Sequence, residues 1–207
     1  MNRFLKISQW WKRHSKEVPA IKVIGVGCGG GNIVNHMHDL EGNKIALVAC
    51  DMDKATIDRS KASIVLQLGS NGLGAGNKPK IGRMEAEEKT KDIHELLLKN
   101  SPKATFVVTC LGGGCGTGAA PVIARESMKL GITTIGVATI PFKFEGKHKH
   151  EQALNGILEL TNNCDALFLL NNQYILKHYN SLSMTEAFAN ADKLICEIIK
   201  NMIHSIT

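Results

Sequence analysis

Two glycine-rich stretches carry the strongest chemical signal in the sequence. They are GVGCGGGN at residues 25–32 and LGGGCGTGAAP at residues 111–121. Because glycine has no Cβ atom, its backbone N–H groups can approach an anion closely, and the first turn of a helix adds a partial positive charge of roughly half an elementary charge. Each glycine costs up to about 1 kcal/mol relative to alanine inside a regular element. We therefore expect both stretches to bind a polyphosphate.

The hydrophobic pattern predicts the elements that position these stretches. Short apolar runs rich in β-branched residues alternate with amphipathic stretches, which is typical of a parallel sheet covered by helices on both faces. The prediction is an α/β, three-layer, Rossmann-like fold whose ligand lies beyond the carboxyl ends of the strands. The expected strands cover residues 21–26, 44–50, 63–68, 104–110, 132–139 and 165–170, and the expected helices cover 32–40, 82–99, 119–130, 149–162 and 183–204.

Length and composition favour a single cytoplasmic domain. The chain has 207 residues and 43% hydrophobic content, and it contains no long apolar run and no pattern of a secretion signal. Its six cysteines lack metal-binding spacings, so we expect reduced structural thiols. The predicted organisation is a basic N-terminal arm over residues 1–19 and one folded unit over residues 20–207.

The positive charge of the chain is concentrated in the arm. Net charge is +6 and the pI is about 9.0, and residues 1–16 combine Lys and Arg with Trp10 and Trp11 and contain no acidic residue. A poorly ordered basic arm is the usual explanation of such a segment, and weak contact with a membrane surface is the alternative. The body of the chain has no aromatic-basic motif for nucleic acids, so we do not expect a nucleic-acid partner.

The first glycine stretch also fits a dinucleotide-binding fingerprint. Gly25, Gly27 and Gly30 match GxGxxG, and Asp51 and Asp53 follow the second strand, where such a fold places a ribose-binding acid. A Rossmann-type, NAD-binding oxidoreductase is therefore an alternative. The chain has no GxxxxGK[ST] sequence, which excludes a P-loop protein.

The chain from about residue 21 onward resembles the tubulin/FtsZ family of GTPases. The resemblance is carried by IKVIGVGCGGGN, GLGAGNKPKIGR, LGGGCGTGAAPVIA, PFKFEGK and EAFANAD, and the third of these segments resembles the glycine signature of the family. It implies GTP or GDP as the ligand, with Mg²⁺ held through the phosphates and no metal site made by the protein alone.

The resemblance also implies which residues bind the nucleotide. The loop at residues 72–76 would sense the γ-phosphate, Glu145 would contact the ribose, and Asn172 would contact the base. Lys149 stands where the family usually has an arginine near the nucleotide, which keeps the charge and loses the bidentate fork. The phosphate-binding set is Cys28, Gly29, Gly30, Gly31, Asn32, Gly74, Ala75, Gly76, Gly113, Gly114, Gly116, Thr117 and Gly118.

Recognition of guanine can also be argued from the residues. Ser183 and Glu186 form a capping-box pattern that begins a long helix. Phe188 and Asp192 are four positions apart and therefore share one face of that helix. A carboxylate can accept from both the ring N–H and the exocyclic amine of guanine, and an aromatic ring can pack against the base. Adenine does not offer that pair of donors.

Departures from the family pattern limit the expected activity. Asp51 replaces an asparagine of the family and Cys115 replaces a threonine, so we expect altered nucleotide affinity. The sequence ends at Thr207, before the acidic loop with which the family assists hydrolysis on a neighbouring subunit. We therefore expect no catalytic residue of its own, weak GTPase activity alone, and assembly with full-length FtsZ or capping of its filaments at the division site or the inner membrane surface.

Overall fold

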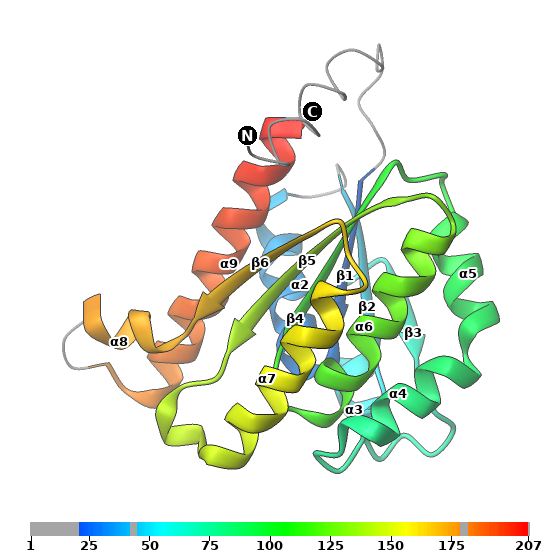
Figure 1. The fold of residues 1–207 in the computed structure, drawn as a ribbon. Coiled ribbons are helices and arrows are strands. Elements are labelled where there is room, and N and C mark those ends of the chain that lie inside the picture. Colours follow the sequence, from blue (N-terminus) through cyan, green and yellow to red (C-terminus); the bar gives the residue numbers. More distant parts are fainter. Residues whose placement is uncertain (1–20, 42–44, 179–181, 207) are drawn as a thin grey trace.

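The computed structural model describes residues 21–41, 45–178 and 182–206. They form one six-stranded sheet in the order β3-β2-β1-β4-β5-β6, and every neighbouring pair is parallel (Figure 1). The predicted arm and its membrane contact lie outside these residues. The strands are β1 Ile21–Val26, β2 Ala46–Asp51, β3 Ile64–Gln67, β4 Ala104–Cys110, β5 Thr133–Ile140 and β6 Ala166–Asn171.

Helices cover both faces of the sheet, which confirms the three-layer prediction. In Figure 1, α6 and α7 lie in front of the sheet and α2 lies behind it. Alternate residues of a strand point to opposite faces, so Val23 packs with α2 and α9 while Ile24 packs with α5 and α6. The helices are α2 Gly27–Glu41, α3 Lys54–Asp58, α4 Pro79–Glu88, α5 Thr90–Leu98, α6 Gly114–Lys129, α7 Lys147–Thr161, α8 Gln173–His178 and α9 Met184–Ile206, and a 3₁₀ turn, η2, covers Lys143–Glu145.

Three predicted helix boundaries were wrong. The helix expected from residue 32 begins at Gly27. The stretch 82–99 forms two helices that meet at Lys89, and the Thr90 hydroxyl donates a hydrogen bond to the Glu87 carbonyl at this break (2.6 Å). The helix expected from residue 119 begins at Gly114, because close packing against α4 outweighs the low helix propensity of glycine. The predicted capping box is confirmed: the Ser183 N–H donates to Glu186 Oε2 (2.8 Å) and the Glu186 N–H donates to Ser183 Oγ (3.3 Å).

The central strand β1 contains a charged residue, Lys22. Lys22 on β1 is fully buried, and its ammonium group donates to the carbonyl oxygens of Leu96, Leu97 (3.0 Å) and Lys99 (2.9 Å) at the end of α5. Burial lowers the pKa of Lys22 to about 8. The contacts satisfy carbonyl groups that a helix end leaves without partners. Within the described ranges, no helix is long and apolar enough to cross a bilayer.

Candidate functional site

The two glycine stretches meet at the carboxyl edge of the sheet. β1 and β4 are neighbours, with Val26 opposite Thr109; β1 leads directly into α2, and β4 leads into α6 through residues 111–113. Gly27 has φ of +75°, a conformation that L side chains rarely adopt, and a Cβ atom there would lie 2.8 Å from the Gly116 nitrogen. The amino ends of α2 and α6 therefore lie against each other, so two sets of helix N–H groups are available to one anion.

A cavity of about 500 Å³ opens at this point. It extends from the two glycine stretches to β6 and the first turns of α9, and its volume is in the range of small-molecule sites. Most of the predicted nucleotide-binding residues line it. They are Cys28, Gly29, Asn32, Gly74, Ala75, Gly113, Gly114, Gly116, Glu145, Lys149, Asn172, Phe188 and Asp192.

The remaining predicted residues lie outside the lining of this cavity. Gly31 lines a smaller adjoining cavity of about 190 Å³ with Cys28 and Asn32. Gly76 has φ of +54° and faces open space, whereas Gly30 packs so closely on β4 that a Cβ atom would lie 2.5 Å from the Val108 carbonyl oxygen.

Thr117 and Gly118 serve the packing around the signature. The Thr117 hydroxyl accepts a hydrogen bond from the Gly112 N–H (2.8 Å), which holds the signature turn in place. A Cβ atom on Gly118 would collide with the carbonyl of Pro79, so this glycine lets α4 approach α6.

One end of the cavity presents unsatisfied acceptors. Asn172 is 4% exposed, and its Oδ1 atom has no hydrogen-bond partner among the described residues. Asp192 lies one turn beyond Phe188 on α9, and burial raises its pKa to about 7. The Phe188 ring meets the fully buried Phe142 ring edge-on, with centroids 5.1 Å apart. This end suits a ligand with a flat apolar body and N–H donors on its edge.

Glu145 and Lys149 form the wall next to that end. Glu145 Oε1 accepts a hydrogen bond from the Phe142 N–H (2.8 Å), and Glu145 Oε2 pairs with Lys149 Nζ (3.2 Å). The carboxylate is thus fixed at η2 by two contacts. Its remaining acceptor positions and the half-exposed ammonium group can still contact a polar ligand.

The other end of the cavity contains two carboxyl groups that were outside the predicted binding set. Asp51 is 4% exposed, and its Oδ1 accepts from the N–H groups of Met52 (2.7 Å) and Asp53 (3.2 Å). Its Oδ2 has no partner among the described residues, and burial raises its pKa. Asp53 begins α3 by accepting from the Ala55 N–H (2.9 Å). Their place at the end of β2 was visible in the sequence, where both supported the NAD alternative and Asp51 was expected to alter nucleotide affinity, but neither was assigned to the binding set.

The loop at residues 72–76 closes this end. Leu73 bridges to Asp53, and the Lys54 N–H donates to the Gly72 carbonyl (3.1 Å), so the loop is tied to the start of α3.

Thr139 and Cys110 also line the cavity. Burial raises the pKa of the Cys110 thiol to about 12, so it adds no negative charge. Thr139 follows from the sheet order alone, since β5 ends at the same edge as β4.

Comparisons with known proteins separate the two families that the sequence suggested. Residues 20–180 match the model of the tubulin/FtsZ family, GTPase domain. The cell division protein FtsZ of Porphyromonas gingivalis is 44% identical over 178 residues, which cover 84% of this chain and 39% of that protein. FtsZ of Aquifex aeolicus is 39% identical over 186 residues, covering 88% of this chain and 50% of that protein. The chain thus spans half or less of the length of these relatives.

Comparison with solved structures points to the same fold. An FtsZ dimer from M. jannaschii superposes with a TM-score of 0.88 at 30% identity, covering 98% of this chain and 59% of that chain. CetZ2 from Haloferax volcanii has a TM-score of 0.81 at 22% identity, which supports the fold only. The strand order alone could not distinguish a GTPase domain of this family from a dinucleotide-binding domain, because both share it. The family match does not favour the NAD alternative. The chain belongs to the tubulin/FtsZ family, within its GTPase domain.

Proposed function

We propose that this chain binds GTP and GDP in the 500 Å³ cavity and acts as an FtsZ-like protein of cell division in the cytoplasm. The observation that carries the proposal is the meeting of two helix amino ends, two desolvated acceptors and an aromatic ring around one cavity. The helix N–H groups suit phosphates, and the acceptors suit the N–H edge of guanine. The matched relatives from Porphyromonas gingivalis and Aquifex aeolicus are named cell division protein FtsZ.

In this proposal each part of the cavity contacts one part of the nucleotide. The backbone N–H groups of the glycine stretches bind the phosphates, and Gly113 leaves the space next to its backbone open, since a Cβ atom there would meet nothing within 4 Å. Glu145 accepts from the ribose. Asp192 accepts from the ring N–H and the amine of guanine, and Asn172 adds a second amide contact to the base.

Asp51 and Asp53 fit a magnesium ion that arrives with the nucleotide. Mg²⁺ is usually held by one or two carboxylates together with substrate phosphates, and Asp51 offers a buried oxygen without a partner among the described residues. The described residues hold no cluster of three or more His, Cys, Asp or Glu that could bind a metal without a nucleotide. When bound, the ion neutralises phosphate charge that would otherwise face two carboxylates.

Hydrolysis needs a further group in this proposal. The carboxyl groups that line the cavity are Asp51, Asp53, Glu145 and Asp192. The first two suit a metal, and the other two suit the ribose and the base. Phosphoryl transfer depends mainly on positioning and charge stabilisation, including a residue that orients the water. We propose that a neighbouring FtsZ subunit supplies this residue when it docks on the cavity face, so the chain alone hydrolyses GTP slowly and assembles with, or caps, filaments of full-length FtsZ.

Calorimetric titration of the purified chain with GTP, GDP, ATP and NAD in the presence of Mg²⁺ tests nucleotide binding. We expect binding of GTP and GDP, and affinity for ATP and NAD at least about tenfold weaker, because one lost pair of hydrogen bonds to a buried carboxylate costs more than 1.4 kcal/mol. Equal affinity for GTP and ATP would contradict the proposal.

Sedimentation with full-length FtsZ and GTP tests the assembly role. We expect the chain to pellet with the filaments or to reduce the pelleted FtsZ, and we expect GTP turnover by the chain to rise when FtsZ is added. A chain that stays in the supernatant and leaves both assembly and turnover unchanged would refute it.

A further inference from the structure

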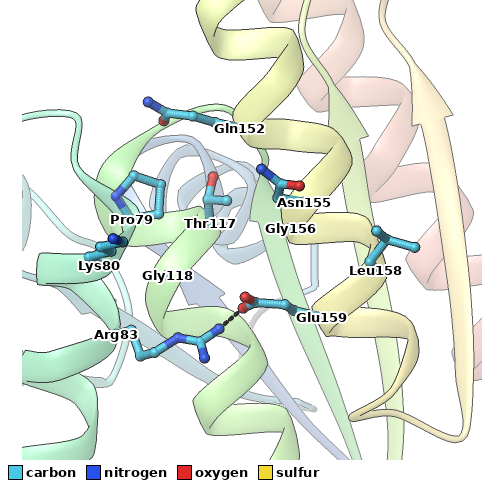
Figure 2. A pocket seen from close by; sticks show the side chains of 10 residues that line it. All are labelled: Pro79, Lys80, Arg83, Thr117, Gly118, Gln152, Asn155, Gly156, Leu158 and Glu159. Atoms are coloured by element: carbon cyan, nitrogen blue, oxygen red, sulfur yellow. Dashed lines mark ion pairs between the residues drawn. The ribbon is translucent and has the colours of Figure 1, made fainter.

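A second cavity, of about 620 Å³, lies between α4, α6 and α7 (Figure 2). It shares no lining residue with the nucleotide-binding cavity. Its back wall is formed by Thr117 and Gly118 on α6, and the ion pair between Arg83 on α4 and Glu159 on α7 spans one end of it. Nothing in the proposed nucleotide chemistry uses this cavity, although its volume is in the range of small-molecule sites.

The walls of the second cavity are rigid. α4 and α6 are in direct backbone contact, since a Cβ atom on Gly118 would collide with the Pro79 carbonyl. α6 and α7 also pack closely, because a Cβ atom on Gly156 would lie 2.7 Å from the Thr117 methyl carbon. The cavity is therefore held open by helix packing and does not depend on a mobile loop.

Three polar groups of the second cavity lack partners among the described residues. Gln152 Oε1 is buried and accepts no hydrogen bond. The Lys80 ammonium group and the Asn155 amide, both exposed at the wall, make no hydrogen bond or ion pair there. In Figure 2, Gln152 and Asn155 project from α7 on one side and Lys80 lies on α4 on the other. A buried acceptor without a donor indicates a missing partner, and the free cation favours an anion.

Two hydrogen bonds connect this cavity to the loops of the nucleotide-binding cavity. Gln152 Nε2 donates to the Asn77 carbonyl (3.2 Å), directly after the loop at residues 72–76. Thr117 Oγ1 accepts from the Gly112 N–H (2.8 Å) in the signature stretch. A molecule that fixes Gln152 therefore also fixes the carbonyl next to the loop expected at the terminal phosphate.

We infer that the second cavity binds a small, flat, anionic molecule with an N–H donor, and that its occupancy changes nucleotide affinity. The anion lies at Lys80, the N–H donates to Gln152 Oε1, and the flat body packs on the Pro79 ring and the Thr117 methyl group. The binding stands on this cavity alone, whereas the change in nucleotide affinity rests on the proposed function. Coupling of this kind is reciprocal, so the nucleotide changes affinity for the second molecule by the same factor.

Indole-5-carboxylate tests the site, because its flat aromatic body carries a carboxylate and an N–H group on opposite edges. We expect the full chain, saturated with GDP to fill the first cavity, to bind one probe with a Kd of roughly 10–100 µM by fluorescence titration. N155W fills the cavity mouth and should abolish binding, and K80Q should weaken it about threefold to fivefold. K91Q makes the same charge change on the exposed face of α5 and should leave binding unchanged.

Two further measurements decide the inference. Backbone amide resonances of Thr117, Gly118 and Gly156 should shift with the probe in the wild-type chain and not in N155W. The Kd for GDP should change at least twofold with saturating probe in the wild type only. Probe binding that is insensitive to N155W overturns the site, and an unchanged Kd for GDP overturns the coupling. Failure of GDP to bind without the probe counts against the proposed function instead, and the N155W comparison still decides the site.

Discussion

Nucleotide affinity should depend on pH through Asp192. Burial raises the pKa of this carboxyl to about 7, and only the carboxylate can accept two hydrogen bonds from guanine. About one tenth of the empty protein is therefore ionised here at pH 6 and about nine tenths at pH 8. Affinity for GDP should rise about tenfold over this interval, which corresponds to about 1.4 kcal/mol.

Fluorescence or calorimetric titration with GDP from pH 6 to pH 8 measures this effect. The nucleotide phosphate also titrates in this range, so the informative quantity is the ratio of Kd values for D192N and the wild type at each pH. The variant D92N, an exposed carboxylate on α5, is the matched control and should follow the wild type. At pH 7, binding should release about half a proton from Asp192, which calorimetry in buffers of different ionisation enthalpy detects.

Asp192 should also make the stability of the nucleotide-free protein depend on pH. Because its folded pKa lies above the unfolded value of 3.8, the folded state binds this proton more tightly. The contribution of Asp192 to the free energy of unfolding therefore falls as pH rises from about 4 to about 7, by at most about 4 kcal/mol, and D192N should remove that slope. A ratio of Kd values that stays constant with pH, together with no proton release, would refute the reasoning.

Three further predictions concern other parts of the molecule. D51N should reduce the loss of GTP affinity that follows chelation of Mg²⁺, because it removes the carboxylate proposed to face the ion; equal losses in both proteins would contradict this. G27A should lower stability by about 2 kcal/mol or more in urea melts and abolish GDP binding, since the new methyl group meets Gly116 at a strained φ. K22A should lower stability by about 2–4 kcal/mol by leaving carbonyls at the end of α5 unsatisfied, while the folded fraction keeps its GDP affinity; an unchanged melt would be the contrary result.

The strands were the most predictable part of the fold. β1 and β4 have the limits that the apolar runs predicted, at residues 21–26 and 104–110. Strands buried on both faces are mostly apolar, so their ends are visible where the apolar run stops. The charged Lys22 inside β1 does not interrupt the strand, because its ammonium group reaches carbonyl groups of α5. No local sequence pattern indicates that contact.

The two glycine-rich stretches were only partly interpretable from the sequence. The residues were assigned to phosphate binding, yet Gly118 is required where α4 and α6 touch, and Gly30 where α2 packs on β4. A close approach between distant segments depends on tertiary structure, so the pattern of glycines alone could not separate packing from ligand contact. The second cavity could not be predicted from the sequence for the same reason, since its lining comes from three helices with no shared motif.

The contact between Gly27 and Gly116 leaves no room for a methyl group between the first turns of α2 and α6. α2 directly follows the central strand β1, and α6 is joined to the neighbouring strand β4 by three residues, so neither helix start can move toward the other. The two helix starts therefore form one closely packed unit at the middle of the sheet. In the proposed function, we therefore expect the loss of a terminal phosphate to move the peripheral loop at residues 72–76, which is tied to the small helix α3.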